Sequence, residues 1–527
     1  MAVIKPSITT VAFDVITQSP SLILRLRKSL DLCSAQQTVY LSDGKAKSRI
    51  DSSMQLIHAL KWSFLSEIAS KAIQPIVFVI LARLLTPEDY GIVAAASMVI
   101  SFSQIFWEAG TSKALIQYQG DRNEAANAAF WINITLGILV SSALLALSNL
   151  ISENIFHDPR VELVIDVLTL QVMLSALTSV HIALLQKDMQ FKHLFWVRLV
   201  TVAIPAIISI PLAWHGKGYW ALISGTLVGQ LMQVLIIWQI SYWKPVVGID
   251  INIVKQLSNF GGWVATTGLL SWFYIWADSL IIGLYLGSHE LGLYRTGNAI
   301  VTMIYGCIFG PLMPVLYSHF SEIQTDRERV RTTLFKVIQI ITFLSIPMAV
   351  FLFTNASFIS NALFSEKWKG IELVISVMAL MHGYSWIIGA NGEAYRAVGA
   401  PANETITMSL TLVFYIVGYF LSIQHGLQAF IWTRLALALA ACGAHLWVAK
   451  RVVNLNIIPT VTYVAKISLV CLPLVAIAHA LQWSNIASYE TKNILIDIIL
   501  LFISLWAVER RGLIQTTLTL VAKRHLK

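Results

Sequence analysis

Two acidic side chains lie inside stretches of the chain that otherwise consist mainly of apolar residues. Asp278 is the only acid between residues 262 and 286, and Glu67 is the only acid between residues 62 and 84. A carboxylate at the centre of a membrane helix costs about 2.5–3.5 kcal/mol on insertion scales, so it faces protein or water rather than lipid. Either acid could take up a proton or a sodium ion and couple a movement of the protein to an ion gradient.

Alternatively, these acids could form ion pairs with basic residues. Arg434 lies about two turns inside another apolar stretch and Arg295 begins a further one, so either could hold Asp278 in a buried ion pair that locks two lobes of the fold together. Lys71 lies four residues after Glu67 and could neutralise it on one helix face. A pair that forms in one conformation and breaks in another would act as a gate.

Four apolar stretches carry polar residues at the spacing of one helix face. Because lipid cannot solvate such a face, we expect the four faces to meet each other or water. The alternative for the Ser and Thr positions is close packing or hydrogen bonding between helices. The four stripes are Ser63, Glu67, Ser70 and Gln74; Ser97, Ser101, Gln104 and Glu108; Thr267, Ser271, Tyr274 and Asp278; and Arg295, Asn298, Thr302 and Tyr305.

The elements that would position these residues are membrane-spanning helices. The 527 residues are 57% hydrophobic and only 12% charged, which is the composition of an integral membrane protein rather than a soluble one. A span needs about 20 predominantly apolar residues, and this pattern predicts an all-α protein with about 14 transmembrane helices. The predicted spans are 62–84, 92–109, 128–150, 162–185, 195–214, 219–241, 262–286, 293–318, 333–354, 371–393, 404–423, 427–448, 461–481 and 494–508.

Charge indicates the orientation of these spans. Lys and Arg residues concentrate in one set of connections and in the C-terminal tail, and the opposite set contains few of them. The positive-inside rule therefore places both termini in the cytoplasm. This topology accounts for the net charge of +9, so no nucleic-acid partner is expected. No spacing of Cys, His or acidic residues indicates a metal site or a cofactor.

One short segment is written twice. "LARLLTPEDYG" ends at Gly91 and "IGLYLGSHELG" ends at Gly292, 201 positions later (292 − 91 = 201), and both face outward in the predicted topology. Six spans separate them, so the repeat is parallel, with its axis along the membrane normal. We interpret Glu88 and Asp89 as helix caps rather than catalytic acids. The predicted organisation is a disordered extension at 1–53, six-helix lobes at 54–247 and 248–449, and two further helices with a basic tail at 450–527.

The repeated turns, together with "WADSLIIG" at 276–283 and "AYRAVGAPANETI" at 394–406, resemble a known family. The chain is similar to the polysaccharide transporters, the Wzx-type flippases, of the multidrug/oligosaccharidyl-lipid/polysaccharide exporter superfamily. The resemblance implies two six-helix lobes around a central cavity, and alternating access. It also implies a cargo, an oligosaccharide repeat unit on undecaprenyl diphosphate, moved from the inner to the outer leaflet of a bacterial inner membrane.

Such a cargo assigns roles to several residues. A diphosphate favours arginine, whose guanidinium fork matches phosphate oxygens, so Arg295 and Arg434 are expected to contact the headgroup. Arg198 and Arg396 could do the same or could anchor helix ends at the membrane surface. Tyr274 lies in the aromatic run 272–278, which could stack on sugar rings or form part of an interfacial belt. Two polar cavity-lining residues complete the set of candidates: Asn298 and Thr302.

Other functions fit the sequence less well. A multidrug or cation antiporter, or an exporter of another lipid-linked precursor, would use the same scaffold, although cationic residues favour an anionic lipid cargo. A membrane glycosyltransferase or polymerase would need paired acid and base groups, which the short outer connections do not contain. We therefore expect no enzymatic activity, and we expect lipid-linked oligosaccharide, membrane lipid and other polysaccharide assembly proteins as partners.

Overall fold

The protein folds almost entirely into α-helices in the part of the chain that the computed structural model describes, which is residue 62 and residues 73–108, 110–248 and 250–483. Residues 73–84 form a short apolar helix that precedes the long ones. The helices that follow are α4 (Pro87–Glu108), α5 (Thr111–Gln117), α6 (Arg122–Ile151), α7 (Pro159–Lys187), α8 (Phe191–Trp214), α9 (Tyr219–Ile240), α10 (Ile251–Phe309), α11 (Leu312–Glu322), α12 (Arg327–Thr354), α13 (Ala356–Leu363), α14 (Ile371–Ser385), α15 (Gly389–Ala397), α16 (Ala402–Ile423), α17 (Gly426–Val453) and α18 (Ile457–Trp483).

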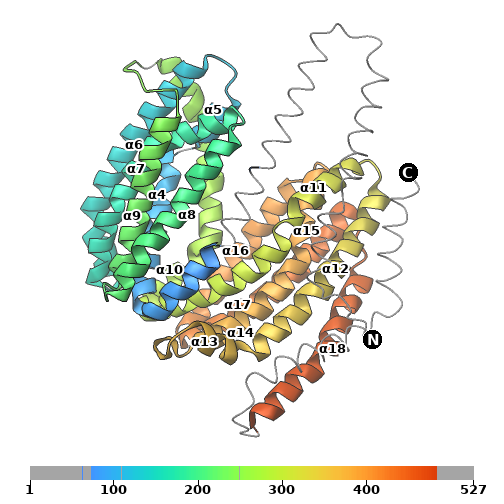
Figure 1. The fold of residues 1–527 in the computed structure, drawn as a ribbon. Helices are drawn as coiled ribbons and strands as arrows, with labels where there is room; N and C mark the ends of the chain where they lie inside the picture. Colours follow the sequence, from blue (N-terminus) through green and yellow to red (C-terminus); the bar gives the residue numbers. More distant parts are fainter. Residues whose placement is uncertain (1–61, 63–72, 109, 249, 484–527) are drawn as a thin grey trace, which may run out of the picture.

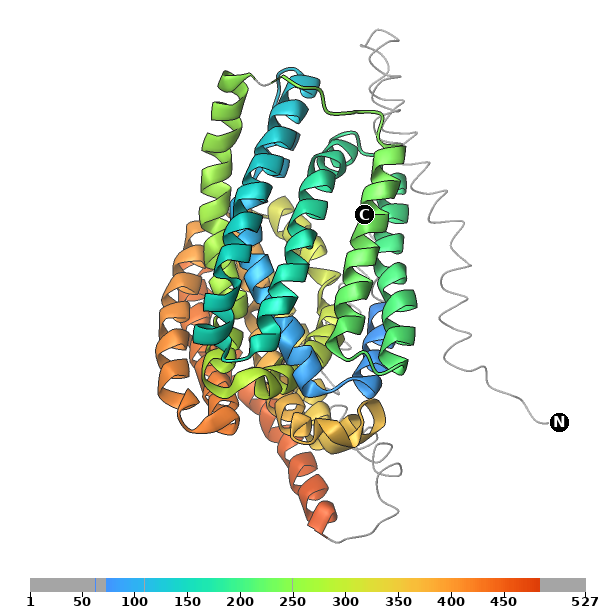
Figure 2. The ribbon, with the colours of Figure 1, turned by 90° about the vertical axis from the view of Figure 1, so that its left-hand side faces the viewer.

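Two groups of helices stand side by side (Figure 1). Helices α4 to α9 form the first group, and α11 to α18 form the second (Figures 1 and 2). The groups meet at the lower end of the view in Figure 1 and diverge toward its upper end. We call the lower end, which carries residues 85–91 and 287–292, the seam end, and we call the opposite end, which carries the connection 241–250, the linker end.

Helix α10 connects the two groups. Its first part packs on the first group, where Val264 contacts Gly110, and its second part packs on α14, where Val374 contacts Gly297. Gly287 interrupts the helix at the seam end with φ 84° and ψ −175°. This φ lies in the left-handed region that favours glycine, so the kink is encoded at this one position. The predicted span 262–286 thus lies in the first arm of α10, and the predicted span 293–318 covers the second arm and continues past Phe309 into α11.

Acidic residues begin several of the long helices. The carboxylates of Asp121, Asp158, Asp250 and Asp326 accept hydrogen bonds from backbone N–H groups in the first turn of α6, α7, α10 and α12. These caps satisfy donors that have no partner inside the helix, and the negative charge complements the helix dipole. All four lie in connections between the candidate membrane spans.

The chain is a multi-pass membrane protein. Ten helices in the described residues are long and apolar enough to cross a membrane. Along α16, side chains three or four residues apart, from Ile406 to Leu421, are more than half exposed, as expected for a face in contact with lipid. The all-helical fold that the sequence predicts is therefore confirmed. The total of about 14 spans, the parallel repeat and the lobe boundaries stay predictions, because residues 63–72 and 494–508 lie outside the described residues.

Candidate functional site

A polar cavity of about 400 Å³ lies where α10 meets α4 and α5. Its lining residues come from both predicted lobes, 54–247 and 248–449. Ser101, Gln104 and Glu108 line it from α4, and Lys113 lines it from α5. Thr267 and Ser271 line it from the first part of α10, together with two tryptophans, Trp272 and Trp276.

The helical spacing of these residues explains why they meet. Ser101, Gln104 and Glu108 follow one face of α4, and Thr267 and Ser271 follow one face of α10. These two of the four predicted stripes thus meet over five residues, whereas the stripe that begins at Arg295 does not line this cavity. The remaining members of the stripes, Ser97 on α4 and Tyr274 and Asp278 on α10, do not line this cavity.

Hydrogen bonds order the cavity wall. The indole Nε1 of Trp272 donates to the Ser101 hydroxyl at 3.0 Å, which ties α10 to α4. The amide of Gln104 donates to the Glu108 carboxylate at 2.9 Å. These bonds hold an aromatic ring, an amide and a carboxylate on one wall, and such groups bind sugar hydroxyls and sugar ring faces.

Arg295 lies behind the cavity rather than in it. Its guanidinium stacks on the Trp276 ring, 4.0 Å from the ring centroid, and donates to the Ser279 hydroxyl at 3.4 Å. The cation therefore lies against one face of a tryptophan that also lines the cavity. The cation that lines the cavity itself is Lys113 of α5, which was not among the residues that the sequence predicted for the site.

Asp278 is saturated by donors from two helices, α10 and α17. Its carboxylate pairs with the guanidinium of Arg434 on α17 and accepts the Tyr294 hydroxyl at 2.6 Å. The Ser279 backbone N–H and hydroxyl also donate to it, and only 4% of the Asp278 side chain is exposed. Arg434 contacts the Tyr294 hydroxyl as well. Of the two roles predicted for Asp278, this geometry favours the ion pair over uptake of an ion.

The ion pair differs from the predicted one in its position. Asp278, Tyr294 and Arg434 all belong to the predicted lobe 248–449, so the pair holds α10 and α17 together within one lobe. It does not join one lobe to the other. The sequence could not indicate this, because the spacing of Asp278 and Arg434 along the chain does not determine which helices pack together.

Asn298 and Thr302 converge on a histidine of α14. The Nε2 atom of His382 lies 3.0 Å from Asn298 Oδ1 and 3.3 Å from Thr302 Oγ1. Thr302 remains exposed, which leaves this small polar cluster open to its surroundings.

The other predicted residues lie elsewhere. Arg396 pairs with Glu393 at 2.6 Å and with Glu404 at 3.4 Å, and Arg198 lines a separate pocket formed by residues 182–233 of α7, α8 and α9. Tyr274 is 40% exposed and stacks on Tyr415, with 6.4 Å between ring centroids. The two remaining candidates, Glu67 and Lys71, lie outside the described residues.

The described residues contain no group of three or more His, Cys, Asp or Glu side chains that could hold a metal ion. The cavity offers aromatic faces, hydroxyls, one amide, one carboxylate and one ammonium group.

Comparison with known proteins identifies relatives over much of the chain. Residues 80–373 match the family model described as polysaccharide biosynthesis protein. The succinoglycan biosynthesis transport protein ExoT of Rhizobium meliloti is 26% identical over 61% of this chain and 65% of its own length. The lipopolysaccharide biosynthesis protein WzxC of Escherichia coli is 21% identical over 62% of this chain and 66% of its own length. The chain thus matches about two thirds of the length of these two relatives.

Solved structures share the fold. The lipid II flippase MurJ, in an inward closed conformation, superposes with a TM-score of 0.66 and 16% identity over 86% of this chain and 99% of its own. A multidrug resistance MATE family transporter, in an inward-facing conformation, superposes with a TM-score of 0.60 and 15% identity over 72% of this chain and 94% of its own. The family match covers more than half of the chain and confirms the predicted resemblance: the chain belongs to the polysaccharide biosynthesis protein family.

Proposed function

We propose that the protein is a flippase that moves an undecaprenyl-diphosphate-linked oligosaccharide repeat unit from the inner to the outer leaflet of the bacterial cytoplasmic membrane, for the synthesis of a surface polysaccharide. The observation that carries the proposal is a polar, tryptophan-lined cavity between α4, α5 and the first part of α10 in a chain of this family. Relatives named as succinoglycan and lipopolysaccharide biosynthesis proteins support the cargo class. The proposal is of a transporter, without catalytic chemistry.

In the proposed orientation the linker end faces the cytoplasm and the seam end faces outward. The basic connections of the predicted topology then lie on the cytoplasmic side. The structure has its helix groups in contact at the seam end and divergent at the linker end (Figure 1). Cargo would thus enter from the cytoplasmic side, and release would require the seam end to open, as alternating access demands.

The cavity residues suggest how the cargo would lie. Trp272 and Trp276 would stack on sugar rings, and Gln104 and Glu108 would bond sugar hydroxyls. Lys113, near the linker end, would meet the diphosphate as the lipid enters. Arg434 is already neutralised by Asp278, so Arg295 remains the better candidate of the two arginines for a charge that acts on the cargo.

An ion gradient is not required for this transport. Moving a dianion outward across 100 mV, negative inside, releases about 4.6 kcal/mol if no protein charge moves with it. Asp278 has four donors in this conformation, so uptake of an ion by Asp278 would require its pair with Arg434 to open. Glu67 is the other candidate from the sequence.

The first experiment measures undecaprenyl-diphosphate oligosaccharide in the inner leaflet of cells that lack the protein. We expect it to accumulate, and we expect wild-type protein to reverse the accumulation. Arg434→Ala and Asp278→Asn should fail to do so, because each leaves a buried charge or donor set without its partner. Rescue by well-expressed variants would refute the role of the pair and retain the flippase. No accumulation at all would redirect the work to a drug exporter or another lipid-linked cargo.

A further inference from the structure

The two helix groups touch through glycines at the seam end. A Cβ atom added to Gly91 would lie 1.7 Å from the carbonyl oxygen of Ser288, and one added to Gly292 would lie 1.8 Å from that of Pro87. The contact is reciprocal, because both Gly292 and Ser288 lie 201 positions after their counterparts (292 − 91 and 288 − 87). The repeated segment thus packs against its own copy, backbone to backbone.

Aromatic side chains seal the seam on both sides of this crossing. Trp368, from the second group, is buried, and its Nε1 donates to the carbonyl of Leu85 at 3.2 Å while its ring packs on Tyr90. Phe156, from the first group, is buried against Gly283 of α10, where an added Cβ would lie 3.0 Å from its ring. Trp368 of the second group thus inserts into the first group at the seam end, and Phe156 packs on α10 beside it.

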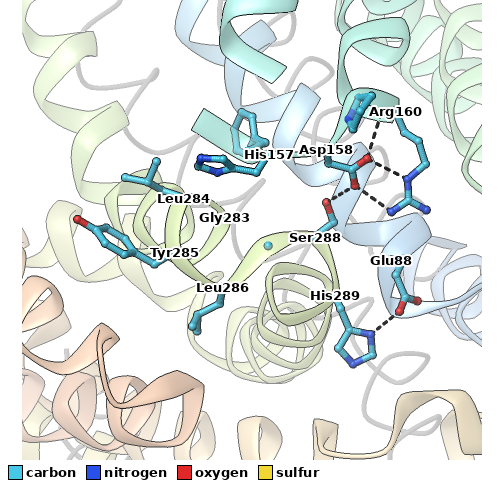
Figure 3. Close-up of a pocket in the computed structure, with 13 residues that line it drawn as sticks. Glu88, His157, Asp158, Arg160, Gly283, Leu284, Tyr285, Leu286, Ser288 and His289 are labelled. Carbon is cyan, nitrogen blue, oxygen red and sulfur yellow. Dashed lines mark hydrogen bonds and ion pairs between the residues drawn. The ribbon is translucent and has the colours of Figure 1, made fainter. Parts of the chain in front are cut away.

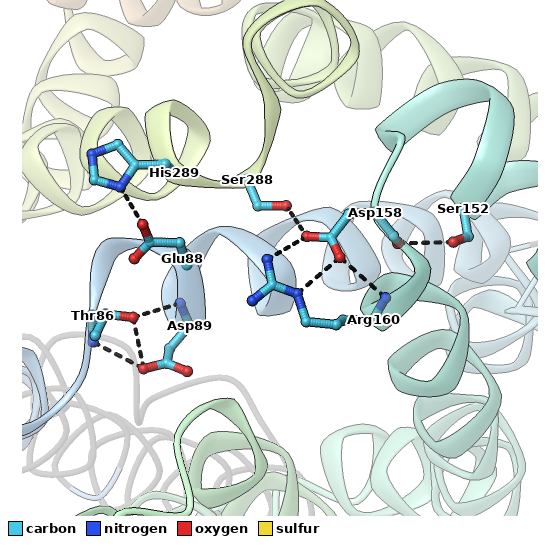
Figure 4. A network of polar contacts seen from close by, with 8 residues as sticks. All are labelled: Thr86, Glu88, Asp89, Ser152, Asp158, Arg160, Ser288 and His289. Atoms are coloured by element: carbon cyan, nitrogen blue, oxygen red, sulfur yellow. Dashed lines mark hydrogen bonds and ion pairs between the residues drawn. The ribbon is translucent and has the colours of Figure 1, made fainter.

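One pair of side chains across the seam can change its charge. The Nδ1 atom of His289 lies 2.6 Å from the Glu88 carboxylate (Figure 4). These two residues occupy the same position in the two copies of the repeated segment (289 − 88 = 201). Glu88 thus has a partner across the seam that the sequence did not indicate. Asp89 belongs to the cap of α4, since its carboxylate accepts the Thr86 N–H at 2.9 Å and the Thr86 hydroxyl accepts the Asp89 N–H at 3.2 Å.

A second polar contact crosses the seam beside this pair and cannot change in the same way. The Ser288 hydroxyl donates to Asp158 at 2.8 Å, and the Arg160 guanidinium binds the same carboxylate through two bonds of 2.9 Å (Figure 4). Burial raises the pKa of Asp158, but the hydrogen bonds from Arg160 and Ser288 outweigh it, and the pKa is lowered. Near neutral pH this contact is therefore constant.

Solvent reaches the titratable pair. An open pocket of about 840 Å³ lies beside it at the seam end (Figure 3). Glu88 and His289 are each about two-fifths exposed. The other titratable and charged side chains that line this pocket are His157, Asp158 and Arg160, from the turn into α7, and Tyr285 of α10. Glu290 follows His289 in the sequence. Protons from the compartment at the seam end therefore have direct access to His289.

We propose that the Glu88–His289 pair is an acid-sensitive latch on the outer gate, an inference that rests on the proposed transport function and its orientation. Imidazole is the side chain that changes charge between pH 5 and 8. A protonated His289 forms a charge-assisted pair with Glu88, and a neutral one keeps only an ordinary hydrogen bond. A more acidic outer compartment therefore holds the seam closed and slows opening toward that side.

The test measures the width of the seam directly, without transport. Spin labels at two exposed seam-end positions, Asn154 in the first group and Asn361 in the second, report the distance across the seam in full-length protein in lipid nanodiscs. Between pH 8 and pH 5.5 we expect the ratio of closed to open protein to rise about two- to fivefold, the range for pairs of this exposure.

Matched variants separate the latch from its surroundings. His289→Gln keeps a donor but cannot titrate, so it should abolish the pH dependence. Ser288→Ala removes the contact with Asp158 that does not change with pH, so it should preserve the pH dependence of the seam. His157→Gln replaces the other histidine of the pocket and should preserve the pH dependence as well. The proposal would be overturned if the ratio of closed to open protein did not change with pH in wild type, or if it still changed with pH in His289→Gln.

The outcomes also distinguish the latch from the transport function. If the seam does not respond to pH but the protein still relieves lipid accumulation in cells, the latch proposal is refuted and the flippase proposal is retained. If the seam responds to pH but loss of the protein causes no accumulation, the latch proposal is retained and the cargo assignment is refuted.

Discussion

Replacing Gly292 by alanine should force the seam apart. The new Cβ would lie 1.8 Å from the Pro87 carbonyl oxygen, about 1.6 Å short of the 3.4 Å at which ordinary van der Waals contact begins. Both contacting groups are backbone of helix starts, so no side chain can rotate to relieve the overlap. The helices must separate in the closed state, whereas the open state has no such contact.

The expected size of the effect follows from packing energetics. Overpacking a tight contact costs about 1–3 kcal/mol, which corresponds to a change of about 5- to 150-fold in the ratio of closed to open protein. Gly306→Ala is the matched control, because it lies in the same helix and an added Cβ there meets nothing within 4 Å. Both variants gain the helix propensity of alanine, about 1 kcal/mol, so their difference isolates the overlap.

The assay is the distance between labels at Asn154 and Asn361, measured for wild type and for both variants at one pH. We expect a longer distance and a smaller closed fraction in Gly292→Ala only. Gly91→Ala should reproduce the effect, since its Cβ would overlap the Ser288 carbonyl in the same way. Equal closed fractions in Gly292→Ala and Gly306→Ala would refute the reasoning, because the glycine crossing would then not limit the approach of the two helices.

Three further predictions concern the buried pair, the cap and the cavity. Asp278→Asn should destabilise the protein by about 3–5 kcal/mol, because Arg434 then lacks its counter-charge, and the double variant with Asp278→Leu and Arg434→Met should recover most of the loss in thermal unfolding. The lowered pKa of Asp158 means that its contribution to stability is present above its ordinary pKa of about 3.9 and is lost as pH falls below it. The difference in Tm between wild type and Asp158→Asn should therefore shrink from pH 6 to pH 3, and a constant difference would contradict this. Trp276→Ala should lower rescue of lipid accumulation about tenfold or more at equal expression, whereas Phe414→Ala, on the lipid-exposed face of α16, should not; equal rescue would remove Trp276 from the cargo path.

The helices and the family could be predicted from the sequence. The apolar stretches have the length that a bilayer requires, and an α-helix satisfies every backbone group within its own segment. Helical periodicity also identified the polar faces of α4 and α10, since the position of a side chain around a helix depends only on its own segment. Because lipid excludes both polar stripes, Ser101 and Gln104 face Thr267 and Ser271.

Partners across the fold could not be predicted in the same way. Asp278 had two candidate arginines and two candidate roles, and only the packing of α10 on α17 selects Arg434 and fills the remaining lone pairs with Tyr294 and Ser279. The position of Lys113 on the cavity wall likewise depends on the packing of α5.

The repeated turn depends both on local sequence and on tertiary packing. The sequence by itself determined that a glycine follows an acidic turn twice, 201 positions apart, and that each copy begins a helix. Only the tertiary structure decided that the two copies cross at those glycines and that Glu88 of one copy binds His289 of the other. The physical reason is that local spacing specifies which face a residue occupies, whereas the rotation and depth of one helix against another depend on the packing of all their neighbours.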